Sequence, residues 1–384
     1  MIFHIAEKEI DTEKIRMWVN SSRGRTLAFW LTAGAVVLLP LMAWFAFGGR
    51  TGRTVDDGTK VTLYTTADEP LVQAVVALFE SKTGVKVNVV TDTEATRGSL
   101  QQRVSSEKPR PRADVWWSSE VVGTVQLAKE GVLAAYASPS EATVPGGWPQ
   151  NLRPKDMRWY GFAERARVIA FRTSSIQKAQ APTKLRDLTR PQYKNKVGMA
   201  NPRFGTTRSH LAFIVATSGE VEARAWLKAM VDNGVQIFPS NSAVVQAVSR
   251  GDVIIGLTDT DDVWAGKKQD WPVDLVYETP DKPKDKFTGL KSLGPLVLPN
   301  TVGRIVGSPN PTAGARLTDF LLSAEVEELL AQSDSHNVPI RADLAKKYPL
   351  YAVPASSPPA AVDYVDVARN EAIAQKIADD VLPK

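Results

Sequence analysis

Short apolar runs typical of strands alternate with helical patterns along most of this 384-residue chain. A strand-like run at 61–64 precedes a helical pattern that begins at 69 and stops at Gly84, and apolar and polar residues then alternate over 85–89. Further strands are expected at 114–117, 168–171, 197–200, 235–238 and 253–257, and further helices at 121–129, 220–233, 242–250 and 362–381. Strands that alternate with helices predict an α/β fold with mixed, mostly parallel sheets, and the length of the pattern predicts two lobes.

The composition excludes several classes of protein. The chain has no cysteine, and its three histidines, His4, His210 and His336, lie far apart without a zinc-binding spacing. Disulfide scaffolds, zinc ribbons and thiol nucleophiles are therefore excluded. The formal net charge is +5, with no basic run interleaved with aromatic residues, so nucleic acid is not an expected partner. We find no nucleophile motif, and we expect neither an enzyme nor a cofactor.

The N-terminal region contains a candidate membrane span. Residues 27–47 form a stretch of 21 residues without a charge, which as a helix would extend about 31 Å, the thickness of a bilayer core. Basic residues are more frequent before this stretch than after it, which predicts a cytoplasmic tail at 1–25, an anchor at 26–48 and a linker at 49–60. The chain would then be a single-pass protein of the cytoplasmic membrane, with the residues after the linker in the periplasm. A cleaved signal peptide is the alternative, since Ala46 and Gly48 form a small-x-small pattern.

Small polar residues follow successive predicted strands. Ligands of open α/β sheets bind beyond the carboxyl ends of strands, where helices begin. Such residues also cap helices, but their recurrence at five strand ends favours a binding site. The candidate ligand-binding residues are Thr65, Thr66, Ser118, Ser119, Arg165, Gly205, Thr206, Thr207, Asn241, Ser242, Asp259 and Asp261.

The candidate site combines two kinds of charge. Gly205, Thr206 and Thr207 at a helix start predict an anion site, to which Arg165 or Arg167 could add a guanidinium, unless these arginines are solvated hinge charges. Three carboxylates, of Asp259, Asp261 and Asp262, would face that anion site, or form a solvated acidic turn. A zwitterion such as an amino-phosphonate or an amino acid, a metal ion bridged by an anion, or a sugar phosphate would satisfy this arrangement. Core packing is expected for Trp116, Trp117, Tyr160, Trp264 and His210.

Six segments in order resemble the extracellular solute-binding proteins of ABC importers, specifically the ferric-iron-binding family with the type II periplasmic-binding-protein fold. The segments are VTLYTTADEPLVQAVVALFESKTGVKV at 61–87, ADVWWSSE at 113–120, RARVIAFR at 165–172, LRDLTRPQYKNKVGMANPRFGTT at 185–207, NSAVVQAVSRGDVIIGLTDTDD at 241–262 and LGPLVLPNTVGRIVGSPNP at 293–311. The resemblance implies two lobes that close on a solute by hinge motion, and a permease that reads the closed form.

The resemblance also implies a division of the chain. Lobe 1 would comprise 61–162 and a return at 285–345, lobe 2 would comprise 163–284, and a connector with a closing helix would follow at 346–384. The crossing strands would lie near 160–171 and 273–299. We expect a monomer that binds a small charged solute and permease subunits. A membrane-anchored ligand sensor is the alternative function.

One departure from the family concerns the metal. Iron-binding members place two tyrosines after the segment that matches Gly256-Leu257-Thr258-Asp259-Thr260, and here Asp261 and Asp262 stand in those places. Iron binding is thus left open. Carboxylates are hard oxygen donors, so Asp261 and Asp262 remain candidate metal ligands.

Overall fold

A computed structural model describes residues 58–92, 99–282 and 289–383. The predicted cytoplasmic tail, the membrane anchor and nearly all of the linker lie outside these residues. Within the described part of the chain, no helix has the length and apolar character needed to cross a membrane.

The first lobe is formed by two segments that lie far apart in the sequence. Its helix α3 begins with Pro70 in the first turn, and ends at Gly84, which has a φ of 70° and donates its N–H to the Glu80 carbonyl. The elements of this lobe are β1 (Lys60–Thr65), α3 (Glu69–Thr83), β2 (Lys86–Thr91), α4 (Leu100–Ser106), β3 (Val115–Ser118), α5 (Val121–Lys129), β4 (Leu133–Ala134), β10 (Val297–Ile305), α10 (Pro311–Leu321), α11 (Ala324–Gln332) and α12 (Ala342–Ala345).

The second lobe repeats the strand–helix alternation. Its elements are β6 (Val197–Ala200), α6 (Gly205–Ser218), α7 (Glu220–Asp232), β7 (Gln236–Phe238), α8 (Asn241–Arg250), β8 (Ile255–Asp259), α9 (Thr260–Lys268) and β9 (Val273–Val276). Short 3-10 helices connect the lobes and strands: η2 (Pro139–Thr143), η3 (Gln150–Leu152), η4 (Lys178–Gln180), η5 (Leu185–Thr189) and η6 (Pro191–Tyr193). Gly256 allows β8 to lie close to α8, because a Cβ at this position would come within 2.5 Å of the Val244 side chain.

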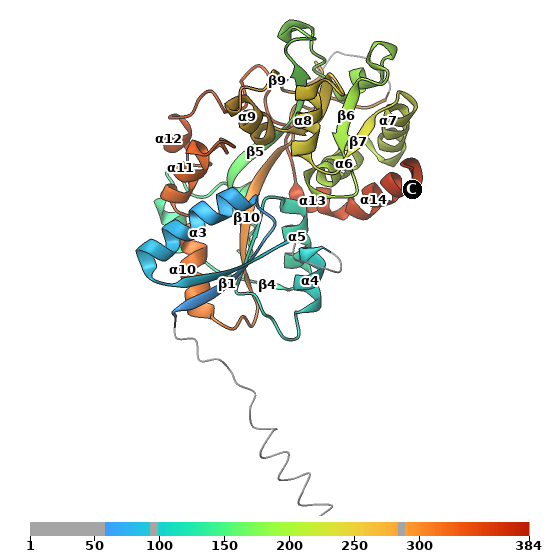
Figure 1. Cartoon of the computed structure of the whole chain (residues 1–384). Coiled ribbons are helices and arrows are strands. Elements are labelled where there is room, and N and C mark those ends of the chain that lie inside the picture. Colours follow the sequence, from blue (N-terminus) through green and yellow to red (C-terminus); the bar gives the residue numbers. More distant parts are fainter. Residues whose placement is uncertain (1–57, 93–98, 283–288, 384) are drawn as a thin grey trace, which may run out of the picture. The chain divides into compact units, whose positions relative to one another are not determined.

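A single long strand, β5 (Tyr160–Arg172), runs through both lobes (Figure 1). Its first half pairs antiparallel with β10, and its second half pairs antiparallel with β8 and β9. The main path of the sheet is β2-β1-β3-β10-β5-β8-β6-β7, with parallel pairs toward both edges. The structure confirms the predicted α/β class with mixed sheets, and the crossing strands supply extensive antiparallel pairing. The lobe boundaries at 162, 284 and 345 stay predictions.

The C-terminal segment forms two helices where the sequence pattern predicted one. They are α13 (Tyr364–Arg369) and α14 (Glu371–Val381), and the helix breaks at Asn370, which caps α13 at its C-terminus. Helix α13 packs against α5 of the first lobe and α6 of the second, whereas α14 packs against α6 and α7. The end of the chain therefore contacts both lobes beside the cleft described next.

Candidate functional site: the interlobe cleft

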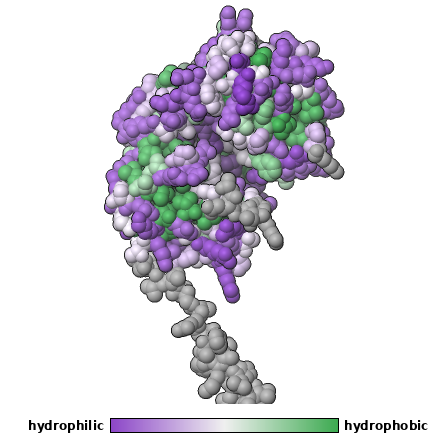
Figure 2. All heavy atoms as spheres, in the orientation of Figure 1, coloured by the Kyte–Doolittle hydropathy of each residue, from purple (hydrophilic) through white to green (hydrophobic). Residues whose placement is uncertain are grey.

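A cleft of about 370 Å³ lies where the strand ends and helix starts of the two lobes face each other. Figure 2 shows hydrophilic surface where the lobes meet. The residues that line this interlobe cleft are Thr66, Asp68, Asp92, Ser99, Gln101, Trp116, Ser118, Ser119, Glu120, Gly123, Arg165, Ala200, Asn201, Phe204, Gly205, Thr206, Thr207, Arg208, Pro239, Ser240, Asn241, Ser242, Asp259, Asp261 and Asp262.

The N-terminus of α6 opens into the cleft without a side-chain cap. Its N-cap residue is Phe204, which is 64% exposed. The Phe204 carbonyl accepts the first hydrogen bond within the helix, from the Arg208 N–H. Gly205 has a φ of 56°, and no atom lies within 4 Å of the place a Cβ would take. The backbone N–H groups of Gly205, Thr206 and Thr207 thus have no intrahelical partner. Together with the positive end of the helix dipole, they suit an anion.

A buried ionic network lies beneath these N–H groups and fixes the elements that carry them. Arg167 Nη1 lies 2.8 Å from Asp259 Oδ1, and donates to Thr206 Oγ1 and Asn241 Oδ1 at 3.3 and 3.2 Å. Asp259 Oδ2 accepts from Thr206 Oγ1 at 2.6 Å and from Asn241 Nδ2 at 3.0 Å. Both oxygens of Asp259 are therefore engaged within the protein, and this carboxylate positions the ends of β5, β8, α6 and α8.

The charge state of the network follows from burial and pairing. Burial raises the pKa of Asp259, but Arg167 and Arg165 outweigh it and hold that pKa below its ordinary value. Burial and the neighbouring Arg167 together lower the pKa of His210 to about 3, so the imidazole is neutral at neutral pH. His210 Nδ1 accepts from Arg167 Nε at 3.4 Å, and the ring is buried, as expected of a core histidine.

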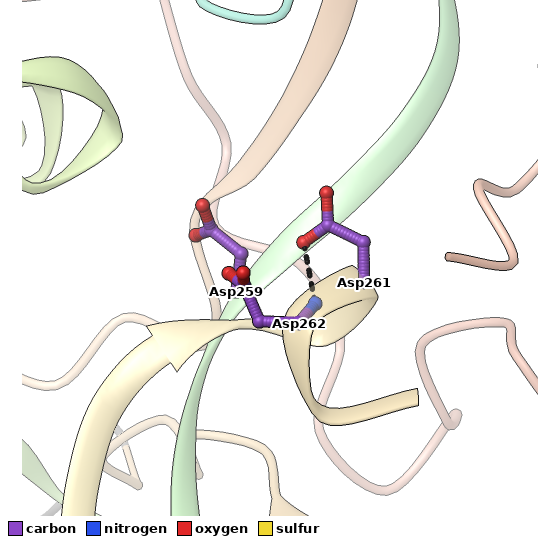
Figure 3. Close-up of side chains that lie close together, drawn as sticks. All are labelled: Asp259, Asp261 and Asp262. Atoms are coloured by element: carbon purple, nitrogen blue, oxygen red, sulfur yellow. Dashed lines mark hydrogen bonds between the residues drawn. The ribbon is translucent and has the colours of Figure 1, made fainter. Parts of the chain in front are cut away.

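Asp261 and Asp262 lie in the first turn of α9 and form the acidic side of the cleft with Asp259 (Figure 3). Ligand atoms from the three residues lie within 4.8 Å of one another. Burial raises the pKa of Asp261 to about 7, although Arg165 Nε, 3.3 Å from Asp261 Oδ2, opposes the rise. Burial and the neighbouring Asp261 raise the pKa of Asp262 well above its ordinary value. This side of the cleft is therefore short of positive charge and would favour a cationic group.

The first lobe contributes hydroxyls and a carboxylate. Thr66 Oγ1 and Ser118 Oγ lie 2.9 Å apart, and Ser119 Oγ donates to the Thr66 carbonyl at 3.1 Å. The Glu120 carboxylate caps α5 by accepting from two N–H groups of its first turn, and it also accepts from Ser209 Oγ of α6 at 2.5 Å. Glu120 is thus a direct link between the lobes at the cleft.

The structure brings the sequence candidates together with one exception. All the candidate ligand-binding residues line the cleft apart from Thr65, whose side chain is fully buried and accepts from Ala67 N–H. Arg165 lines the cleft as one partner of the aspartates, and its buried Nη1 has no hydrogen-bond acceptor among the described residues. That these residues bind a solute stays a prediction.

Sequence reasoning missed several lining residues. Asp68 follows the first strand and begins α3, so the rule that identified Thr66 could have found it. Arg208 follows the two threonines at the start of α6 and was not among the predicted residues. Trp116 was expected in the core; it is almost fully buried, yet it also borders the cleft. No tyrosine lines the cleft in the ranges that the structure covers.

Comparison with known proteins identifies relatives of the whole two-lobed region. Residues 74–358 match the family described as bacterial extracellular solute-binding protein. Iron uptake protein A1 of Synechocystis sp. is 25% identical over 282 residues, which cover 73% of this chain and 76% of that protein. A putative 2-aminoethylphosphonate-binding periplasmic protein of Salmonella typhimurium is 25% identical over 270 residues, 69% of this chain and 73% of that protein. A ferric binding protein from Campylobacter jejuni has a similar fold, with a TM-score of 0.70 and 21% identity over 84% of this chain and 99% of that one.

Proposed function

Since the chain belongs to the bacterial extracellular solute-binding proteins and is a binding protein rather than an enzyme, we propose that it is the substrate-binding component of an ABC-type importer. It captures a small anionic or zwitterionic solute in the interlobe cleft, and permease subunits receive the solute. In this proposal the binding domain is a monomer on the periplasmic side, tethered by the predicted membrane anchor at 26–48.

One observation carries the proposal: the cleft has opposite preferences at its two sides. The uncapped start of α6 offers the N–H groups of Gly205, Thr206 and Thr207 to an anion. Asp261 and Asp262, with Asp68 on the opposing lobe, offer carboxyl groups, and a bound cation would favour the ionised form of the two whose pKa burial raises. A phosphonate or phosphate ester fits the first side, and the ammonium group of an amino-phosphonate or amino acid fits the second. The likeness to a relative named for 2-aminoethylphosphonate supports this ligand class.

A metal ion bridged by an anion is the second candidate ligand. Three carboxylates within 4.8 Å of one another favour it, and relatives named for iron support it. Asp259 is engaged by Arg167 and Thr206, however, so Asp261 and Asp262 would be the ligands on this lobe. The donor set would then be carboxylates without tyrosines.

The test is isothermal titration of the full chain in detergent with 2-aminoethylphosphonate, an α-amino acid, inorganic phosphate, and ferric ion with phosphate. The informative variant is Ser242→Asp, which adds a carboxylate at the N-terminal turn of α8 on the cleft wall. This change suits the helix dipole and should not destabilise the fold. It should weaken binding of an anionic solute at least tenfold, about 1.4 kcal/mol.

The matched control is Val221→Asp, which places the same residue in the N-terminal turn of α7, where Val221 is 76% exposed and outside the cleft. The control should bind like the original chain. If Ser242→Asp and the original chain bind the anionic solute with equal affinity, the proposal that an anion binds at this wall of the cleft is wrong. Binding of ferric ion alone, unaffected by phosphate, would favour the metal candidate without a bridging anion.

A further inference from the structure

A second cavity, here called the side groove, opens beside the C-terminal helix α14 and has a volume of about 630 Å³. It lies between α4 and α5 of the first lobe and the pair α6 and α14. Ser99, Gln101 and Arg208 line both the side groove and the interlobe cleft. The two cavities are therefore adjacent at these residues, and a solute held in the cleft could extend toward the groove.

The walls of the side groove are polar and carry few charges. Arg208 Nε lies 2.5 Å from Glu371 Oε1, and the exposed Glu130 carboxylate accepts from Ser105 Oγ at 2.6 Å. The remaining lining is amide and hydroxyl groups with one alanine, and it includes no large apolar side chain. Such a surface suits neither an apolar tail nor a second ion, but it suits hydroxyl and amide groups.

Part of this hydrogen-bonding capacity is unused by the described residues. Gln101 Nε2 donates to Gln126 Oε1 at 2.6 Å, which leaves the Gln126 amide nitrogen without an acceptor in the described part of the chain. Gln375 Nε2 makes only long contacts of 3.3 Å with Asp379, and its carbonyl oxygen has no donor there. Donors and acceptors on opposite walls, from α5 and α14, thus face the groove.

The position of Arg208 indicates how a solute bound in the cleft would extend toward the side groove. This residue lies one turn into α6, directly after the N–H groups that form the anion side of the cleft. A solute held by its anionic group at the start of α6 would reach the side groove by passing Arg208. The anion side of the cleft and the polar side groove thus lie next to each other, with Arg208 at their shared border.

We propose that the side groove is a subsite for a neutral, hydroxyl- or amide-bearing extension of the solute, which makes the solute an anionic compound with a polar tail, such as the phosphate ester of a polyol. This rests on the proposed function and narrows its ligand class. A compact ion would leave the groove unused.

The test compares three ligands that share one head group: inorganic phosphate, glycerol 3-phosphate and glucose 6-phosphate, titrated into the full chain in detergent. Ala372→Trp fills the groove from α14, and Ser106→Trp fills it from α4, because both residues line it and are exposed. Lys376→Trp, exposed on the same helix but outside the groove, is the matched control. Thermal unfolding verifies that each variant folds.

We expect at least one ester to bind tenfold or more tightly than phosphate, and either groove variant to remove that gain while phosphate binding and the Lys376→Trp control stay unchanged. Equal affinities for phosphate and both esters, or a gain that survives both groove variants, would overturn the subsite while leaving the proposed function intact. Absence of binding by all three ligands would overturn the anion site of the proposed function, and the subsite with it.

Discussion

The buried pair of Arg167 and Asp259 allows a quantitative test of how the cleft is held together. Arg167→Met removes the guanidinium but keeps most of the side-chain volume, so Asp259 loses its 2.8 Å partner. Breaking one side of a buried pair costs about 3–5 kcal/mol of unfolding free energy. Asp259 retains Arg165 at 3.4 Å and the donors Thr206 and Asn241, so we expect the low end, about 3 kcal/mol.

Urea denaturation and calorimetry of the full chain measure this cost. A loss of about 3 kcal/mol corresponds to a fall in Tm of roughly 4–5 °C for a folded region of more than 300 residues. The double variant Arg167→Met/Asp259→Asn removes both charges, and should be more stable than the sum of the single effects predicts by about 2 kcal/mol. A cost of Arg167→Met below about 1 kcal/mol, or single effects that simply add, would refute the role given to this pair.

Two further predictions concern other buried positions. Burial raises the pKa of Glu278 to about 7, although the bond from Ser292 opposes the rise. Because this folded-state pKa lies above the ordinary 4.5, the stability that neutral Glu278 contributes is complete below about pH 4.5 and is lost as the pH rises through 7. Glu278→Gln should remove this loss, which amounts to up to about 3 kcal/mol of unfolding free energy by pH 8. Urea denaturation at several pH values measures it. The prediction is wrong if the unfolding free energies of the two proteins change with pH in parallel. Gly256→Ala should lower the unfolding free energy by about 1–3 kcal/mol because its Cβ would come within 2.5 Å of Val244, and an unchanged urea midpoint would show that β8 and α8 can separate at no cost.

The sequence allowed most of the fold to be predicted because its local signals agree with each other. Gly84 and Gly251 end α3 and α8 in left-handed conformations, as the patterns indicated. The C-terminal region was predicted less well, since helical periodicity over 362–381 continues across Asn370, where the structure separates two helices. Both helices pack against α6, but α13 also contacts α5 and α14 also contacts α7, and periodicity does not encode this change of partner.

The candidate site, like the fold, could be predicted from the sequence only in part. Polar residues at successive strand ends predicted that Thr66, Ser118, Thr206 and Asn241 would converge, and they line one cleft. The pairing of Arg167 with Asp259 was not predicted, because it depends on the antiparallel register of β5 and β8, in which these two residues are direct partners. Register between strands so distant in sequence cannot be read from either strand alone.

The side groove could not be predicted for a related reason. It exists because α14 packs against α6, although the two helices lie more than 150 residues apart in the chain. Gln126 and Gln375 look like ordinary surface residues in the sequence. Only their placement on facing walls gives them a role.

The most direct measurement is a crystal structure of the chain with the solute that binds most tightly in the titrations. We expect the anionic group of the solute to lie within hydrogen-bond distance of the N–H groups of Gly205, Thr206 and Thr207, with any cationic group toward Asp261 and Asp262. A solute bound outside the interlobe cleft, or one whose anionic group contacts the aspartates, would contradict it.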